Sequence, residues 1–232
     1  MKTQIRKGCF ETNSSSMHAI VITKDKPENI YTGYACEFRV GEFGWEHRRY
    51  MDFMDKASYL WTIIVNGNLK KVYEGTFYKS NYDGKEYENY HYELDIENEE
   101  YKKIKKAITD TLISVGFEDD GWNIRFQEKF EKTSYGSLEI GYVDHDPGIG
   151  FVKEIVFNRD RFIRFLFSPT SFIETWNDNE WKIDPEIEEE IENKYWDEEK
   201  QDYKDGYWEA EGWAHFIMPK EKDIEWKYLK GN

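Results

Sequence analysis

Several features that would assign this chain to a protein class are scarce or missing. It has only two cysteines, Cys9 and Cys36, and they form no CxxC pair, so they cannot build a disulfide framework and are expected as reduced thiols. No stretch approaches the roughly 18 apolar residues that a membrane helix needs. The first ten residues are charged and contain no apolar run of signal-peptide length. These absences predict a cytoplasmic protein.

Positive charge is also in deficit. The chain has 32 Lys and Arg against 47 Asp and Glu, a formal net charge of −15. A nucleic-acid binder usually carries a basic face, so direct binding of nucleic acid is not expected, and anionic membranes are disfavoured for the same reason. An acidic surface suits a basic partner or a cation, and it equally serves plain solubility.

Aromatic residues are plentiful and argue for a folded chain. Apolar residues reach only 39 %, but Trp, Tyr and Phe together make up 18 % of the 232 residues. Each aromatic ring can bury about 150–250 Å², so few are needed to fill a core. Disordered chains are poor in such residues.

Hydrophobic periodicity predicts an α+β fold with a mainly antiparallel sheet, several packed helices and an acidic C-terminal segment. Strands are expected at residues 4–10, 17–23, 34–40, 72–79, 86–96, 122–129, 138–143 and 170–176, and helices at residues 50–65, 99–115, 158–167 and 184–196. The strand at 17–23 is apolar on both faces, which predicts a central position. We expect a core domain over residues 1–183, with residues 184–232 as an acidic, aromatic-rich helix and tail packed on it.

Two local patterns are specific enough to test. The helix at 99–115 carries an apolar stripe through Ile104, Ile108 and Leu112, and Gly116 follows as its C-terminal cap. In the strand at 86–96, apolar residues alternate with polar ones, which predicts one buried and one wet face. The buried set is expected to be Tyr90, Tyr92, Leu94 and Ile96.

A polar run from Glu11 to His18 is the most unusual stretch. Hydroxyls and backbone N–H groups in such a loop can bind an anion, and His18 could act as a general acid or base. Ser14 and Ser16 are the candidate nucleophiles for the loop from Thr12 to His18. The simpler alternative is a structural turn with His18 hydrogen-bonded in the core. The run has no glycine-rich cradle, so it is not a P-loop.

The same stretch carries a resemblance. The string from Arg6 to Ile20, RKGCFETNSSSMHAI, resembles the N-terminal signature of a group of uncharacterised proteins of Gram-positive bacteria and their phages. The segment from Phe165 to Asn179 is similar to one in that group, with Trp176 where a glycine is expected. The resemblance implies a mobile-element origin and no known activity. If the gene belongs to a phage, the protein would lie in the cytoplasm of the host cell.

Asp144, His145 and Asp146 form a second candidate site. Two carboxylates around a histidine could ligate a divalent metal, with His18 or Asp178 completing the set. Because neighbouring residues of a strand point to opposite faces, the three converge only in a turn, which Pro147-Gly148 favours. The alternative is a polar β-turn. No cofactor is expected.

The segment from Asp184 to Glu211 is the third candidate. It contains thirteen Asp or Glu and three Lys, so it holds −10 of the chain's net charge of −15, and aromatic residues are interleaved with the acids. Carboxylates at this density could compete for a basic nucleic-acid groove, and aromatic residues are frequent interface anchors. The alternative is a solvated helix with its aromatics folded onto the core. The partner-binding candidates are Glu188, Glu189, Glu190, Glu192, Trp196 and Trp208.

Two functions from different classes follow. In the first, the chain is a phage or mobile-element accessory protein that binds and inhibits a basic, nucleic-acid-handling host protein. Such a partner could be a nucleic-acid-guided defence effector, which would make the chain an anti-defence protein of the anti-CRISPR type, acting by nucleic-acid mimicry. In the second, it is an enzyme that acts on a phosphate-bearing or nucleotide substrate through the Thr12–His18 loop. Charge asymmetry favours the first.

Overall fold

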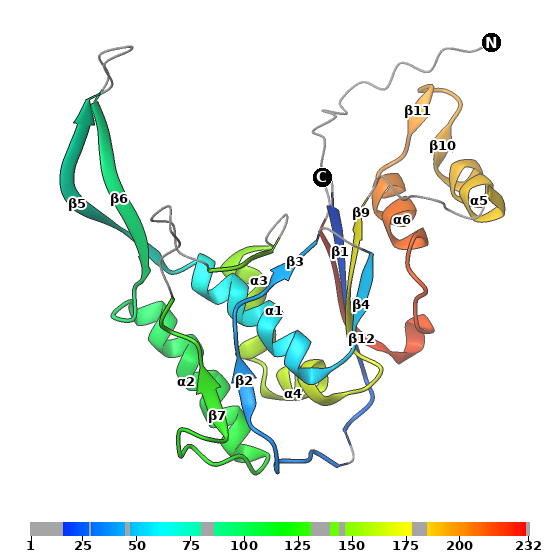
Figure 1. Ribbon diagram of the computed structural model, residues 1–232. Helices are drawn as coiled ribbons and strands as arrows, with labels where there is room; N and C mark the ends of the chain where they lie inside the picture. The colour runs from blue at the N-terminus through cyan, green and yellow to red at the C-terminus, as the bar shows by residue number, and fades with distance from the viewer. Residues whose placement is uncertain are drawn as a thin grey trace.

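A computed structural model describes residues 16–27, 29–44, 47–79, 86–130, 140–143, 147–177 and 185–230. The main sheet has four strands in the order β12-β1-β9-β4, and every neighbouring pair in it is antiparallel (Figure 1). Its strands are β1 (Ser16–Thr23), β4 (Arg48–Tyr50), β9 (Phe172–Asn177) and β12 (Ile224–Lys230). The predicted α+β class with a mainly antiparallel sheet is therefore confirmed.

Four two-stranded sheets accompany the main sheet. Two are antiparallel: β5 (Leu69–Lys79) with β6 (Glu86–Leu94), and β10 (Trp196–Asp197) with β11 (Asp202–Tyr203). Two are parallel: β2 (Cys36–Phe38) with β7 (Ile124–Phe126), and β3 (Glu42–Phe43) with β8 (Tyr142–Val143).

The helices are α1 (Phe53–Asn66), α2 (Glu99–Ser114), α3 (Gly148–Val156), α4 (Arg159–Phe167), α5 (Pro185–Tyr195) and α6 (Tyr207–Ala214), with a short 3₁₀ helix η2 (Glu221–Asp223) before β12. Among the residues that the structure describes, none of these helices has both the length and the apolar character needed to cross a membrane.

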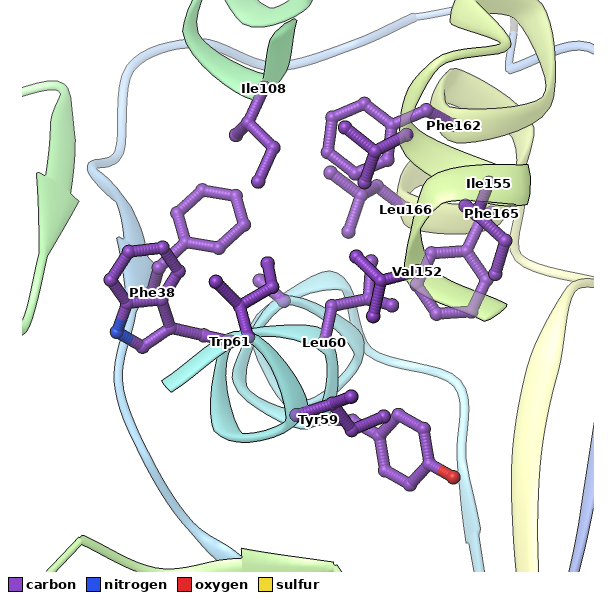
Figure 2. Close-up of a cluster of buried hydrophobic side chains, with 14 of the residues drawn as sticks. Phe38, Tyr59, Leu60, Trp61, Ile108, Val152, Ile155, Phe162, Phe165 and Leu166 are labelled. Atoms are coloured by element: carbon purple, nitrogen blue, oxygen red, sulfur yellow. The ribbon is translucent and has the colours of Figure 1, made fainter. Parts of the chain in front are cut away.

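Helix α1 lies at the centre of the hydrophobic core. Asp52 caps its N-terminus by accepting a hydrogen bond from the amide of Met54. Every residue from Tyr59 to Val65 is buried, because α2, α3, α4 and the sheet surround the helix. Figure 2 shows Leu60 and Trp61 of α1 among side chains from α2, α3 and α4. A helix that is apolar on all sides is stable only in such a buried position.

The predicted stripe of α2 is confirmed. Ile104, Ile108 and Leu112 are completely buried in the core. Asn98 caps the first turn, and Gly116 follows the helix with a φ of +105°, a conformation that favours glycine. The predicted helix at 158–167 is also confirmed as α4, with Asn158 as its N-cap.

Strand β1 occupies the central position that its sequence predicted, between β12 and β9. Ile20 and Ile22 belong to the main core, whereas Val21 packs in a smaller cluster with Phe172 and Ile224. Strand β12 comes from the tail that follows the acidic segment, so the tail contributes an edge strand to the main sheet.

The predicted burial of the strand at 86–96 is wrong in part. Leu94 is buried, but Tyr92 and Ile96 are 43 % and 48 % exposed, and Ile96 lies beyond the end of β6. The physical reason is visible in Figure 1, where the β5–β6 hairpin projects away from the body. Alternation predicts a buried face only where another layer covers that face, and Leu94 is near the base of the hairpin.

Other differences concern short elements. Helix α3 was not predicted at all, and the strands expected at 122–129 and 138–143 are reduced to β7 and β8 in the described residues. The strand expected at 4–10 lies outside the described residues.

Candidate functional site

His18 lies in the core. Its side chain has no exposed surface, and its Nδ1 atom is 2.9 Å from the hydroxyl oxygen of Tyr59 on α1. His18 faces α1 because it alternates with Ala19 along β1, on the same face as Ile20. This geometry is that of a core histidine satisfied by a hydrogen bond, the simpler of the two alternatives raised by the sequence. A substrate could reach His18 only through the packed interior.

Most of the other residues of the two polar candidate sites lie outside the described residues. Ser14 lies outside them, and for Ser16 only the backbone is described, at the first residue of β1. Asp144, His145 and Asp146 also lie outside the described residues, so the metal site stays a prediction. Within the described part of the chain, no group of three or more His, Cys, Asp or Glu side chains could hold a metal ion.

The acidic segment folds into α5, the β10–β11 hairpin and α6, which we name the C-terminal surface. Helix α5 has little contact with the body: Glu188, Glu189, Glu190 and Glu192 are all exposed, and only Ile191 and Tyr195 are half-buried between positions 186 and 195. A helix that is polar on nearly every side gains little from core packing. Its carboxylates therefore remain in water and available to a partner.

Aromatic side chains of this segment pack on one another. The rings of Tyr203 and Tyr207 stack with their centroids 3.7 Å apart, and Trp196 meets Tyr203 edge-on at 5.2 Å. Trp208 meets Tyr207 edge-on at 5.0 Å, while Tyr195 is 6.4 Å from Tyr207. None of the five belongs to either hydrophobic core cluster. The alternative in which these aromatics fold back onto the core is thus not what the described residues show.

The exposure of the rings differs across this aromatic cluster. Tyr207 is buried inside it, whereas Trp208 is 66 % exposed and Trp196 is 36 % exposed. Two large apolar side chains therefore face solvent beside the exposed carboxylates of α5. Exposed aromatics among polar groups are typical of interaction surfaces.

The cluster is electrostatically negative. Burial raises the pKa of Tyr207, and the Tyr203 hydroxyl and the Glu211 carboxylate raise it further. Burial likewise raises the pKa of Tyr203, whose hydroxyl donates to Glu192 Oε1 at 3.3 Å. Neutral tyrosines beside carboxylates suit a cation, because the ring face attracts positive charge. The chain itself uses this contact: Lys194 Nζ lies 5.1 Å from the centre of the Tyr195 ring.

A cluster that the sequence did not reveal lies on the face of the main sheet opposite α1. Glu174 of β9 is 5 % exposed and accepts hydrogen bonds from Arg49 Nε at 3.0 Å and Arg49 Nη2 at 2.5 Å. Its other oxygen, Oε1, is 2.8 Å from His47 Nε2, and the imidazole of His47 packs against Trp176. A buried carboxylate thereby orients a half-exposed imidazole. No sequence signal links the three residues, because β4 and β9 are over 120 positions apart.

Lys56 is a second buried polar residue missed from the sequence. It has no exposed surface, and its Nζ donates to the carbonyl oxygens of Ser168 at 3.0 Å and Ser171 at 3.1 Å. Burial lowers the pKa of its ammonium group to about 7, although the Asp52 carboxylate partly opposes the shift. No sequence signal marked it, because Lys56 follows Asp55 in the first turn of α1, where charged residues are common.

Comparison of the chain with protein-family models, with curated proteins and with solved structures gives no match.

Proposed function

We propose that this protein binds a basic, nucleic-acid-handling host protein through the C-terminal surface and blocks the groove that would hold nucleic acid. One observation carries the proposal. The aromatic residues of the acidic segment form their own cluster outside the core, with Trp208 exposed beside the carboxylates of α5.

Carboxylates and aromatics would have separate roles in such a complex. Exposed carboxylates attract a basic surface over a Debye length of about 8 Å at physiological ionic strength, which chiefly raises the association rate. Trp196 and Trp208 can become desolvated anchors, which chiefly lower the dissociation rate. A row of carboxylates presents negative charge where a nucleic acid presents phosphates, so the two would compete for one groove.

The resemblance of the Arg6–Ile20 string supports a phage or mobile-element setting for this activity. In that setting the basic partner is a nucleic-acid-guided defence effector of the host, and the protein is an inhibitor of the anti-CRISPR type. The acidic balance of the chain is consistent with this, since a net charge of −15 repels nucleic acid itself.

The test is a binding measurement with a nucleic-acid-guided effector of a Gram-positive host at low and high salt. Replacing Glu188, Glu189, Glu190 and Glu192 with Gln removes four charges and leaves helix propensity nearly unchanged. The matched control replaces Glu42, Glu118, Asp119 and Glu154, four exposed acids elsewhere, with their amides. Weaker binding of the α5 variant alone, mainly through a slower on-rate, supports the proposal. Equal affinities of both variants and the wild type at both salt concentrations would contradict it.

The anchors need a separate measurement. Trp208→Ala should raise the dissociation rate, because it removes an anchor that is desolvated in the complex. The free protein should lose little stability, because the ring is already exposed. Trp122→Ala is the matched control, since Trp122 is 74 % exposed and lies outside the C-terminal surface. An effector that is already bound to this protein should also fail to bind its guide or target nucleic acid. Simultaneous binding of protein and nucleic acid by the effector would exclude mimicry.

A second candidate function, an enzyme acting on a phosphate-bearing substrate, is favoured by His47. Strand pairing places Ser16 opposite Asn177 and Arg48 opposite Thr175, so His47 lies at the end of the sheet where the polar run enters β1. Glu174 orients this imidazole as a general base would require. Hydrolysis of a phosphomonoester that is lost in His47→Gln but retained in His91→Gln would support the enzyme. Absence of activity across phosphomonoesters and nucleotides would leave His47 as a structural partner of Glu174.

A further inference from the structure

The outer face of the β2–β7 ribbon carries two arginines around one carboxylate. The two strands are parallel, with Glu37 opposite Arg125. Each oxygen of Glu37 contacts one guanidinium: Oε2 pairs with Arg39 Nη2 and Oε1 pairs with Arg125 Nη2. Glu37 is 13 % exposed, whereas Arg39 and Arg125 are 65 % and 44 % exposed. The acid is thus covered by two cations that face solvent.

These residues line a hollow of about 290 Å³ together with Phe38, Phe126 and Gln127. The lining holds two positive charges and one negative charge, so it is net positive within a chain of net charge −15. Among the described residues, each guanidinium pairs with Glu37 through one nitrogen. A guanidinium has five N–H donors, so both arginines retain donors that point elsewhere.

The floor of this hollow is attached to the core. Phe38 and Phe126 stack at 4.9 Å on the inner face of the ribbon and pack against Trp61 of α1. The main chain of Gln127 accepts a hydrogen bond from Trp61 Nε1 at 2.9 Å, and its side chain accepts one from the amide of Val40 at 3.1 Å. Side chains on a fixed backbone lose less entropy when a ligand binds.

The uncovered outer face of the β2–β7 ribbon also favours a ligand site. Parallel strands are nearly always covered on both faces. Here the core covers the inner face, and the outer face is the one that bears the hollow. Figure 1 places β2 and β7 beside α2, away from the C-terminal surface, so this site is separate from the proposed partner-binding surface.

We propose that the β2–β7 hollow binds the phosphate group of a small phosphomonoester through Arg39 and Arg125. Paired guanidiniums match the oxygens of phosphate in bidentate geometry. The hollow exceeds the size of one phosphate group and approaches the lower limit of about 300 Å³ for small-molecule sites, which leaves room for an organic part beside Gln127. Glu37 holds the two arginines in the absence of ligand and reduces the attraction for an anion.

Calorimetric titration of the full chain at constant ionic strength tests this site, with inorganic phosphate and a nucleoside monophosphate as probes and acetate as the reference anion. We expect saturable binding of both phosphates and none of acetate. Tighter binding of the nucleoside monophosphate identifies an organic phosphomonoester as the ligand. Equal binding of the two probes would overturn that part of the proposal. No saturable binding of either would overturn all of it.

Variants then locate the binding. Arg39→Gln and Arg125→Gln should each weaken phosphate binding at least tenfold, by about the value of one charge-assisted hydrogen bond. Glu37→Gln should tighten it, because the local charge becomes more positive. Arg48→Gln on β4, where the arginine side chain is 60 % exposed, is the matched control and should bind like the wild type. Since Arg39 is largely exposed, its variant should fold normally. Unchanged affinity in Arg39→Gln, or weaker affinity in Glu37→Gln, would refute the site.

Discussion

Replacing Lys56 with Met should make the stability of the protein less dependent on pH between pH 7.5 and 9. Lys56 is completely buried in α1, and its ammonium donates to the carbonyl oxygens of Ser168 and Ser171. Two carbonyl dipoles do not replace the hydration of a full charge. Burial accordingly lowers the pKa of this lysine from 10.5 to about 7 in the folded protein.

The direction of the effect follows from proton binding. Between the two pKa values the unfolded chain holds a proton on Lys56 that the folded protein has released. Unfolding in this pH range therefore takes up a proton, which becomes less favourable as the pH rises, so the free energy of unfolding rises with pH. This contribution is complete above the unfolded pKa and is lost as the pH falls toward the folded pKa of about 7.

The magnitude can be worked out from the same shift. Each unit between the folded and unfolded pKa corresponds to about 1.4 kcal/mol, so the whole shift is worth on the order of 5 kcal/mol. From pH 7.5 to pH 9, within that window, Lys56 should add about 2 kcal/mol to the free energy of unfolding of the wild type. The Lys56→Met protein should lack this increment.

Urea denaturation followed by tryptophan fluorescence at pH 7.5, 8.2 and 9 measures the increment. All other groups titrate in both proteins, so the difference between the two pH profiles isolates Lys56. Lys106→Met is the control, because Lys106 is 74 % exposed on α2 and should leave the wild-type profile unchanged. Parallel profiles for the wild type and Lys56→Met would refute the reasoning, whatever the difference in absolute stability, since lost hydrogen bonds shift the whole profile without changing its slope.

Three further outcomes are expected. Ile108→Ala should lower the free energy of unfolding by about 2–5 kcal/mol in chemical denaturation, because the side chain is fully buried. The control Ile113→Ala, at a side chain 46 % exposed, should lower it by under about 1 kcal/mol. Similar losses in the two variants would mean that the stripe is not part of the core. Gly116→Ala should lower the free energy of unfolding by about 1–2 kcal/mol because its φ is +105°, and an unchanged value would mean that the backbone relaxes. Burial raises the pKa of Cys36 to about 12, which disfavours its reactive thiolate. In a Cys9→Ser protein, no thiol should therefore react with a disulfide reagent at pH 8 until urea is added. Immediate reaction would show that Cys36 is accessible.

Helices and the central strand could be predicted because their signals are local. Gly116 follows α2 as predicted, and the apolar stripe of α2 faces the core. The two strands of the β5–β6 hairpin were also predicted, at residues 72–79 and 86–96. Their burial was not, because burial depends on whether another layer covers the ribbon.

The candidate sites were harder to predict from the sequence than the helices and strands. His18 drew attention because it follows a run of hydroxyl residues, yet its hydrogen bond goes to Tyr59 in the core. The imidazole that stays half-exposed and oriented by a carboxylate is His47, and its partner Glu174 lies on another strand. The C-terminal surface was found from charge alone, but the mutual stacking of its aromatics could not be read from their spacing.

The sequence by itself determined the elements that depend on neighbours within a few residues: the amphipathic period of α2, the caps of α2 and α4, the apolar run of β1, and the concentration of negative charge after Asp184. Tertiary structure decided every feature that joins distant segments. These features are the pairing of β12 with β1, the burial of Lys56, the hydrogen bonds of Arg49 and His47 to Glu174, and the ion pairs of two arginines with Glu37. The reason is that periodicity and capping are properties of one continuous stretch of backbone. Burial, ion pairing and hollows depend on which stretches pack together, and the packing is set by the chain as a whole.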